Sequence, residues 1–188
     1  FYFQLIVLQY FFSILIIFQL FKFFKKDLVK VSAVLFILIS FICLIYLRLD
    51  DNYFSYFSFI LMFAICVDIS AFFVGKSLGG PKLAFKLSPG KTISGAIGGI
   101  LIPIFFCIVL FLKNSDFISI FSMTIILSIV AQVGDLVESK LKRYCHVKDS
   151  SNLIPGHGGI LDRLDSILAL IVFVTIMKLF NFDLFFIV

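Results

Sequence analysis

Five acidic side chains in three places are the residues of this 188-residue chain best suited to chemistry. Asp135 and Glu138 are three residues apart, as are Asp162 and Asp165, and residues at this spacing project from one face of a helix. Asp68 lies inside the apolar stretch FAICVDISAFFVG. Carboxylates that gather in one place repel one another unless a cation lies between them, and their hard oxygen atoms suit Mg²⁺.

A glycine- and lysine-rich segment, VGKSLGGPKLAFKLSPGKTISGAIGG, follows Asp68 and covers residues 74–99. Glycine lets backbone N–H groups approach a ligand closely. Thr92 is placed to open a helix, whose N-terminus favours phosphate. The SPGKT part of this segment resembles the end of a nucleotide-binding P-loop. Phe85, however, stands where that motif needs glycine, which excludes a P-loop. Gly95 and Gly99 have the spacing of close helix packing, and the sequence leaves both roles open for them.

A second segment, residues 134–165, places basic side chains next to the acids: GDLVESKLKRYCHVKDSSNLIPGHGGILDRLD. Lys142, Arg143 and Lys148 could offset the charge of a bound anion. His157 lies in the sequence GHGG, shortly before Asp162. A histidine in such a loop can be a hydrogen-bonding group or a catalyst, and both interpretations stay open.

The elements that must position these residues are membrane spans. The chain is 62% hydrophobic and 14% charged, with 27 phenylalanines and no tryptophan, whereas a soluble domain is about half apolar and a quarter charged. This composition excludes a soluble globular domain and predicts an integral membrane protein. The four cysteines are isolated from one another, which indicates neither a zinc site nor a disulfide framework.

Six apolar runs approach the roughly 20 residues that a spanning helix needs. They cover residues 1–21, 31–47, 53–75, 93–112, 117–134 and 161–180. We therefore predict an all-α polytopic membrane bundle of about six transmembrane helices with Gly/Lys-rich cytoplasmic loops. It would form one integral membrane domain over 1–188, with variable spans in 1–60 and a catalytic region in 65–170. The first run lacks the features of a signal peptide, and because the chain begins at Phe1 we expect a further N-terminal segment.

Basic residues indicate the orientation of these spans. The loops between the first and second, third and fourth, and fifth and sixth runs hold twelve Lys and Arg residues, whereas the other side holds three. Cytoplasmic loops carry the excess of Lys and Arg. We therefore expect the chain to start outside and both glycine-containing segments to face the cytoplasm.

With this orientation, three spans bring the acidic residues to a similar depth near the cytoplasmic surface. A position in the first helical turn is a structural explanation for Asp162 and Asp165. Asp68 lies inside its span, where an ionisable residue indicates function, and we favour a divalent metal site. Metal-holding acids beside Gly- and Lys-rich loops predict a polyphosphate substrate, because phosphoryl chemistry depends on positioning and charge neutralisation. The membrane location predicts a lipid as the other substrate.

The segment from Ser139 to Asp165 resembles the signature of the phosphatidate cytidylyltransferases, also called CDP-diacylglycerol synthases. The matching positions are Ser139, Lys142, Arg143, Lys148, Asp149, His157, Gly158, Gly159, Asp162, Arg163 and Asp165. Upstream, Asp68, Gly75 and SPGKT with the glycines after it are similar to a second region of the family, so the resemblance covers about residues 65–170. Two positions depart from the pattern: Ser94 replaces a usual acid and Phe72 a usual tyrosine.

This resemblance implies transfer of CMP from CTP to phosphatidate, giving CDP-diacylglycerol and pyrophosphate in phospholipid biosynthesis. It implies Mg²⁺, with K⁺ sometimes beside it, a homodimer in the membrane (the inner membrane in a bacterium), and no nucleic-acid partner. The metal ligands would be Asp135 and Asp162, joined by Asp165. The implied catalytic residues are Asp135, Asp162, Asp165, Lys142, Arg143 and His157, and the implied substrate-binding residues are Ser88, Lys91, Thr92, Lys148, Asp149, Gly158, Gly159, Arg163 and Asp68.

Two other functions fit parts of the pattern. One is a CTP-dependent lipid kinase, in which a polyprenol or similar alcohol takes the γ-phosphate. The other is a cation transporter that uses Asp68, Asp135, Asp162 and Asp165 as an ion path. A transporter predicts acids near the membrane midplane on broken helices, whereas all of these but Asp68 fall at predicted helix ends beside glycine-rich loops.

Overall fold

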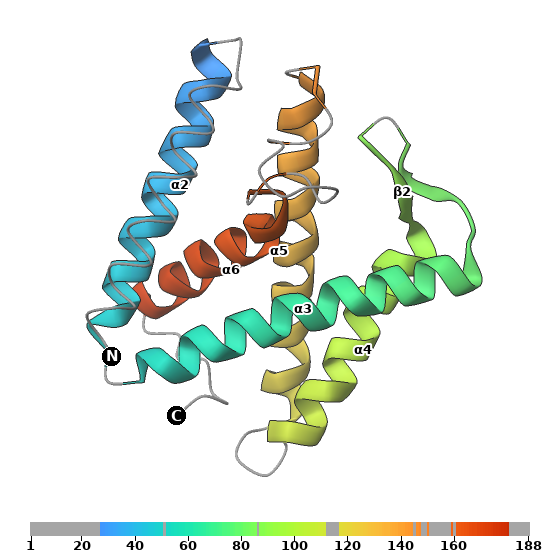
Figure 1. Cartoon of the computed structure of the whole chain (residues 1–188). Helices are drawn as coiled ribbons and strands as arrows, with labels where there is room; N and C mark the ends of the chain where they lie inside the picture. Colours follow the sequence, from blue (N-terminus) through green and yellow to red (C-terminus); the bar gives the residue numbers. More distant parts are fainter. Residues whose placement is uncertain are drawn as a thin grey trace.

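The structure is a computed structural model that describes residues 27–50, 52–85, 87–111, 117–144, 146–147, 150, 159 and 161–180. Its elements are α2 (Asp27–Arg48), α3 (Tyr53–Leu78), β1 (Lys82–Ala84), β2 (Ser88–Thr92), α4 (Ile93–Phe111), α5 (Phe117–Tyr144) and α6 (Leu161–Leu179), shown in Figure 1. The predicted span over residues 1–21 lies outside the described residues.

Three of the described helices are long and apolar enough to cross a membrane, at Phe54–Leu78, Ile93–Phe111 and Phe117–Tyr144. The prediction of a helical membrane protein is therefore confirmed, while the count of about six spans stays a prediction. Helix α5 runs to Tyr144, well beyond the predicted end at residue 134. Glu138 and Lys142 form an ion pair one turn apart in this extension, and such a pair supports a helix.

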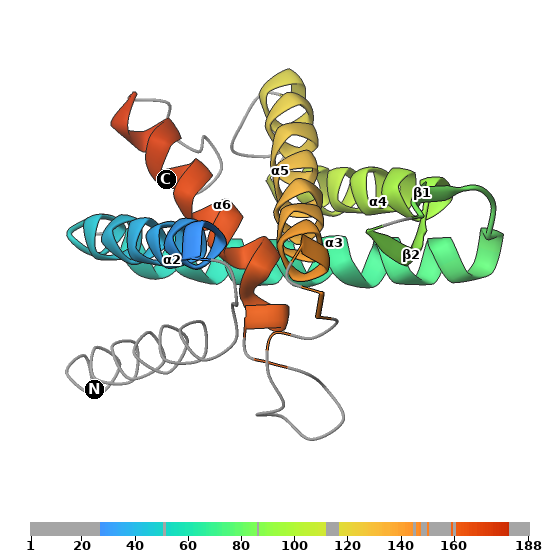
Figure 2. The same ribbon diagram turned by 90° about the horizontal axis from the view of Figure 1, so that it is seen from above.

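The described core lies where α3, α5 and α6 meet. Phe63 and Val67 of α3 pack there with Leu127 of α5 and with Ile171 and Val174 of α6, and each is at most 2% exposed. In both views, α5 crosses α3 steeply, whereas α3 and α4 lie side by side (Figures 1 and 2). The steep crossing brings the C-terminal half of α5 next to the start of α6.

The lysine-rich loop after α3 contains a small antiparallel sheet, which the sequence analysis did not predict. Strand β1 pairs with β2, with Lys82 opposite Thr92 and Ala84 opposite Ser88. Gly79 and Gly80 precede β1 with φ angles of 62° and 103°, a conformation that glycine adopts without steric cost. These two glycines turn the chain back from α3 and bring the hairpin over the start of α4 (Figure 1).

Glycines let α3 and α4 pack closely. A Cβ atom on Gly95 would lie 2.7 Å from the carbonyl oxygen of Ala71, and one on Gly98 would lie 2.5 Å from the Cβ of Val74. A Cβ on Gly99 would lie 3.1 Å from that of Ala71. The structure therefore supports helix packing as the role of Gly95 and Gly99, one of the two roles left open by the sequence.

We expect Gly98→Ala to lower the free energy of unfolding by about 1–3 kcal/mol, the usual cost of forcing extra volume into a packed contact. The new methyl group would overlap the Val74 side chain, so α3 and α4 would have to separate. Thermal unfolding in detergent measures the change. Gly90→Ala is the matched control, because a Cβ there meets nothing within 4 Å, and an equal loss in both variants would contradict the packing argument.

Candidate active site

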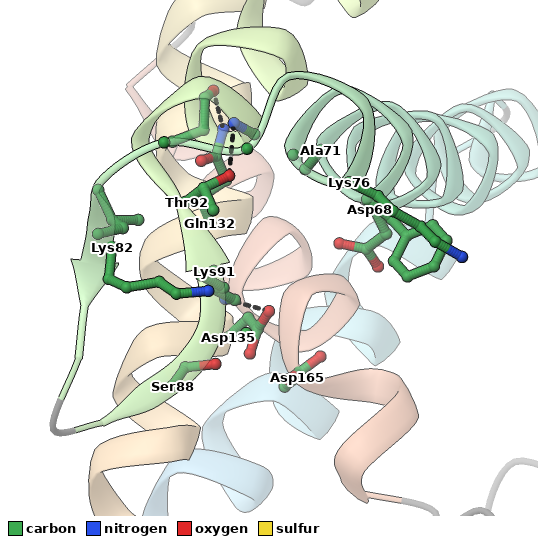
Figure 3. A pocket seen from close by; sticks show the side chains of 18 of the residues that line it. Asp68, Ala71, Lys76, Lys82, Ser88, Lys91, Thr92, Gln132, Asp135 and Asp165 are labelled. Atoms are coloured by element: carbon green, nitrogen blue, oxygen red, sulfur yellow. Dashed lines mark hydrogen bonds and ion pairs between the residues drawn. The ribbon is translucent and has the colours of Figure 1, made fainter.

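A cavity of about 730 Å³ lies between the hairpin, the C-terminal half of α3, the start of α4, α5 and the start of α6. Figure 3 shows part of its lining. The charged residues in the described lining are Asp68, Asp135, Asp162, Asp165, Lys76, Lys82, Lys91 and Lys142. Four acids and four lysines give this lining almost no net charge, so a polyanion that bound there would need additional positive charge.

Asp135 of α5 forms an ion pair with Lys91 of β2 (Figure 3). The two side chains are 28% and 27% exposed, so the pair is open to the cavity. Lys91 is the predicted lysine of the SPGKT segment, and the hairpin is the element that carries it to α5. The pair thus joins the two segments that the sequence analysis singled out.

Asp68 of α3 and Asp165 of α6 lie close enough to Asp135 for the three negative charges to interact. The carboxylates of all three line the same cavity (Figure 3). Ser166 links the first two, because its hydroxyl donates to Asp68 at 3.4 Å and its backbone N–H donates to Asp165 at 2.7 Å. The expectation that acids from separate helices meet at one place is met by this geometry.

Asp162, at the start of α6, is held by several donors at once. Its carboxylate accepts hydrogen bonds from Lys142 Nζ at 2.7 Å, from the hydroxyl and backbone N–H of Ser150, each at 2.9 Å, and from the backbone N–H of Gly159 at 2.7 Å. These bonds hold Ser150 and Gly159 against the start of α6. Asp162 therefore positions Ser150 and Gly159 as well as lining the cavity.

Lys142 lies between two acids. Its ammonium group is 2.5 Å from Glu138 Oε2, one turn earlier on α5, and 2.7 Å from Asp162 Oδ1 on α6. Glu138 is 7% exposed. Glu138 is not among the predicted site residues, and its spacing of one helical turn from Lys142 is the signal that indicates its role. Glu138 thus positions Lys142 at the cavity wall.

Arg143, predicted as catalytic, is placed differently. Its Nε donates to the Leu87 carbonyl at 3.1 Å and its Nη1 to the Val147 carbonyl at 3.4 Å, and it is absent from the described cavity lining. Adjacent residues on an α-helix point about 100° apart, and here Lys142 faces the cavity whereas Arg143 does not. In this structure Arg143 ties the hairpin turn to the end of α5.

Ser88 lines the cavity, as does Thr92, whose hydroxyl also caps α4. The backbone N–H of Gly95 donates to Thr92 Oγ1 at 3.1 Å, which matches the prediction that Thr92 opens a helix. The hydroxyl of Ser94 lies 3.0 Å from that of Thr92 and donates to the Gly79 carbonyl. Ser94, one of the two departures from the family pattern, thus links the end of α3 to the start of α4.

Lys76, Lys82 and Gln132 line the cavity but are not among the residues predicted for the site. Lys82 lines it from β1 and extends toward its interior (Figure 3). Gln132 lines it from α5 and donates to the Ala96 carbonyl at 3.2 Å. Lys82 lies in the glycine- and lysine-rich segment 74–99 but has no predicted role there, and Gln132 lies in no motif. The hairpin and the crossing of α4 by α5 bring them here. The predicted residues Lys148, Asp149, His157 and Gly158, and the side chain of Arg163, lie outside the described residues.

The carboxylate oxygens of Asp135, Asp162 and Asp165 are the ligand type that Mg²⁺ prefers. In the described part of the chain, however, no three His, Cys, Asp or Glu side chains are arranged to hold a metal ion together. Lys91 pairs with Asp135 and Lys142 with Asp162, so an ammonium group already occupies two of these three acids. The type of ligand atom suits Mg²⁺, but Lys91 and Lys142 would have to move away from Asp135 and Asp162 before an ion could bind there.

Comparison with known proteins agrees with the resemblance. Residues 1–180 match the model of the cytidylyltransferase family. Relatives named phosphatidate cytidylyltransferase include those of Bacillus subtilis (44% identical over 64% of this chain and 46% of the relative), Rickettsia bellii (41% over 73% and 66%) and Haemophilus influenzae (37% over 79% and 57%). The chain spans about half the length of most of these relatives.

Proposed function

The chain belongs to the cytidylyltransferase family, and we propose that it transfers CMP from CTP to phosphatidate, giving CDP-diacylglycerol and pyrophosphate. One observation carries this proposal: acids from α3, α5 and α6 and lysines from the hairpin and α5 line a single cavity. Such a site can bind two phosphate-bearing substrates side by side. The relatives' name, phosphatidate cytidylyltransferase, supports the choice of substrates.

In the proposed reaction, a phosphate oxygen of phosphatidate attacks the α-phosphorus of CTP. A bond forms between these two atoms, and the bond from the α-phosphorus to the oxygen bridging to the β-phosphate breaks, so pyrophosphate leaves. A phosphate monoester is largely ionised near pH 7, because its second pKa is about 6. The nucleophile thus needs no strong general base.

The main obstacle is repulsion between two polyanions, and the chain's lysines would reduce it. Lys82 and Lys91, both in the hairpin, would bind the triphosphate of CTP. Lys142 would bind a substrate phosphate where the end of α5 meets the start of α6. Asp135, Asp162 and Asp165 would hold Mg²⁺, which when bound polarises the α-phosphate and stabilises the leaving pyrophosphate. Their coordination would release Lys91 and Lys142 to the substrates.

The setting of the site is also a proposal. The distribution of basic residues supports a cavity that faces the cytoplasm, which is where CTP is available. We further propose about six spans, with α2, α6 and residues 1–21 joining the three long apolar helices, and a homodimer that works within the bilayer, with K⁺ beside Mg²⁺ as the family resemblance implies.

An assay in membranes that contain the chain tests the proposed function. The membranes receive phosphatidate together with CTP that is labelled in either the α-phosphate or the γ-phosphate. We expect α-label in a lipid product, γ-label only in pyrophosphate, and no product without Mg²⁺. Transfer of γ-label to lipid would instead identify a lipid kinase. Uptake of a cation without any labelled lipid would favour the transporter hypothesis.

A further inference from the structure

A second cavity, of about 530 Å³, lies between α2, α5 and α6, and its walls are mostly apolar. Phe36 and Ile37 of α2, Val133 and Val137 of α5, and Phe173 and Ile176 of α6 contribute to these walls. The chemistry of this lining suits hydrocarbon and not a nucleotide.

The polar residues of this second cavity belong to the end of α5 and the start of α6, which lie together. They are Glu138, Lys142, Ser150 and Asp165. A Cβ on Gly134 would lie 2.5 Å from that of Ala169, so α5 and α6 are in close contact between the polar end and the apolar remainder. The cavity therefore changes from charged to apolar along the two helices.

Lys142 and Asp165 line both cavities. They form a common wall, with the polar cavity on one side and the apolar cavity on the other. The Lys142 side chain is only 15% exposed, and its ammonium group lies between Glu138 and Asp162. A phosphate bound at this lysine could thus belong to a molecule whose remaining part lies in the apolar cavity.

We infer that the apolar cavity holds an acyl chain of a phosphate-bearing lipid, with the head group at Lys142 and the chain along α5 and α6. The inference rests on the proposed function and adds to it the place where the lipid binds. Val133, Val137 and Ile176 are 48%, 50% and 43% exposed, so the cavity opens outward from helices that the surrounding bilayer covers. A lipid could enter sideways and keep its chain in an apolar environment throughout the reaction.

Val137 lies close to the common wall formed by Lys142 and Asp165, and the substitution Val137→Trp should obstruct the apolar cavity. We expect it to raise the KM for long-chain phosphatidate about tenfold, the factor expected when two methylene groups lose their burial, and to leave the KM for CTP and for dibutyryl phosphatidate unchanged. Val109→Trp on α4 is the matched control, because Val109 is 66% exposed and lines neither cavity. Equal effects of the two variants, or equal effects on long and short chains, would overturn the inference.

A photoreactive phosphatidate, with a diazirine near the end of one acyl chain, tests the site without requiring turnover. We expect labelling of residues 129–137 and 169–176, reduced by excess phosphatidate but not by phosphatidylcholine. Equal labelling by a diazirine phosphatidylcholine would show that these residues only contact bulk membrane lipid, and it would overturn the inference. If phosphatidate-specific labelling occurs but labelled CTP yields no lipid product, the lipid site stands and the proposed reaction fails.

Discussion

Asp162→Asn is expected to abolish CTP-dependent product formation, with a loss of about 10³-fold, while the protein still inserts into membranes. Removal of a single electrostatic contact at a reacting centre costs about 10²–10³-fold, and this carboxylate has two tasks. It accepts bonds from Lys142, Ser150 and Gly159, and it is a proposed metal ligand. An asparagine would place an NH₂ group against one or more of these donors. Labelled CTP and phosphatidate in membranes measure the effect.

Asp50→Asn is the control for this variant. Asp50 also forms an ion pair with a lysine, Lys178, but it lies between α2 and α3 and lines neither cavity. We expect near-normal product formation from Asp50→Asn and the same elution in detergent for both variants. Normal turnover of Asp162→Asn would contradict its place in the site, and an equal loss in both would indicate a general effect on folding.

The sequence predicts the helices well where local signals mark their ends. The predicted runs begin at 93, 117 and 161, where α4, α5 and α6 begin, because each apolar run follows a stretch of polar residues, glycine or proline. The end of α5 was predicted too early, since a hydropathy pattern ends at Asp135 whereas the helix continues through charged residues. Local polarity marks the edge of a membrane span better than the end of a helix.

The hairpin and the partners of the acids could not be predicted in the same way. β1 has three residues and β2 has five, and strands this short have no clear alternation of their own. The pairing of Lys91 with Asp135 joins residues 44 apart in the chain, so it depends on how α5 crosses α4. Sequence reasoning predicted that acids and lysines meet, but it assigned Arg143 to the site and left out Lys82.

The pairing of Lys91 with Asp135 leads to the second large prediction. A divalent ion at Asp135 must compete with the Lys91 ammonium group, so the two residues should affect metal binding in opposite directions. We expect Lys91→Met to tighten the binding of Mn²⁺, used as a probe for Mg²⁺, about fivefold, which corresponds to the roughly 1 kcal/mol of a partly exposed ion pair. The same variant should raise the KM for CTP, because Lys91 would no longer bind phosphate.

Asp135→Asn should instead weaken Mn²⁺ binding and lower product formation about 10³-fold, with no recovery at higher Mg²⁺ concentration. Titration of Mn²⁺ by electron paramagnetic resonance, in membranes that contain each variant, measures binding without turnover. If both variants weaken Mn²⁺ binding, Lys91 supports the site and does not compete for it. If neither variant changes it, the ion lies elsewhere, and the Lys91–Asp135 pair is a structural link between the hairpin and α5.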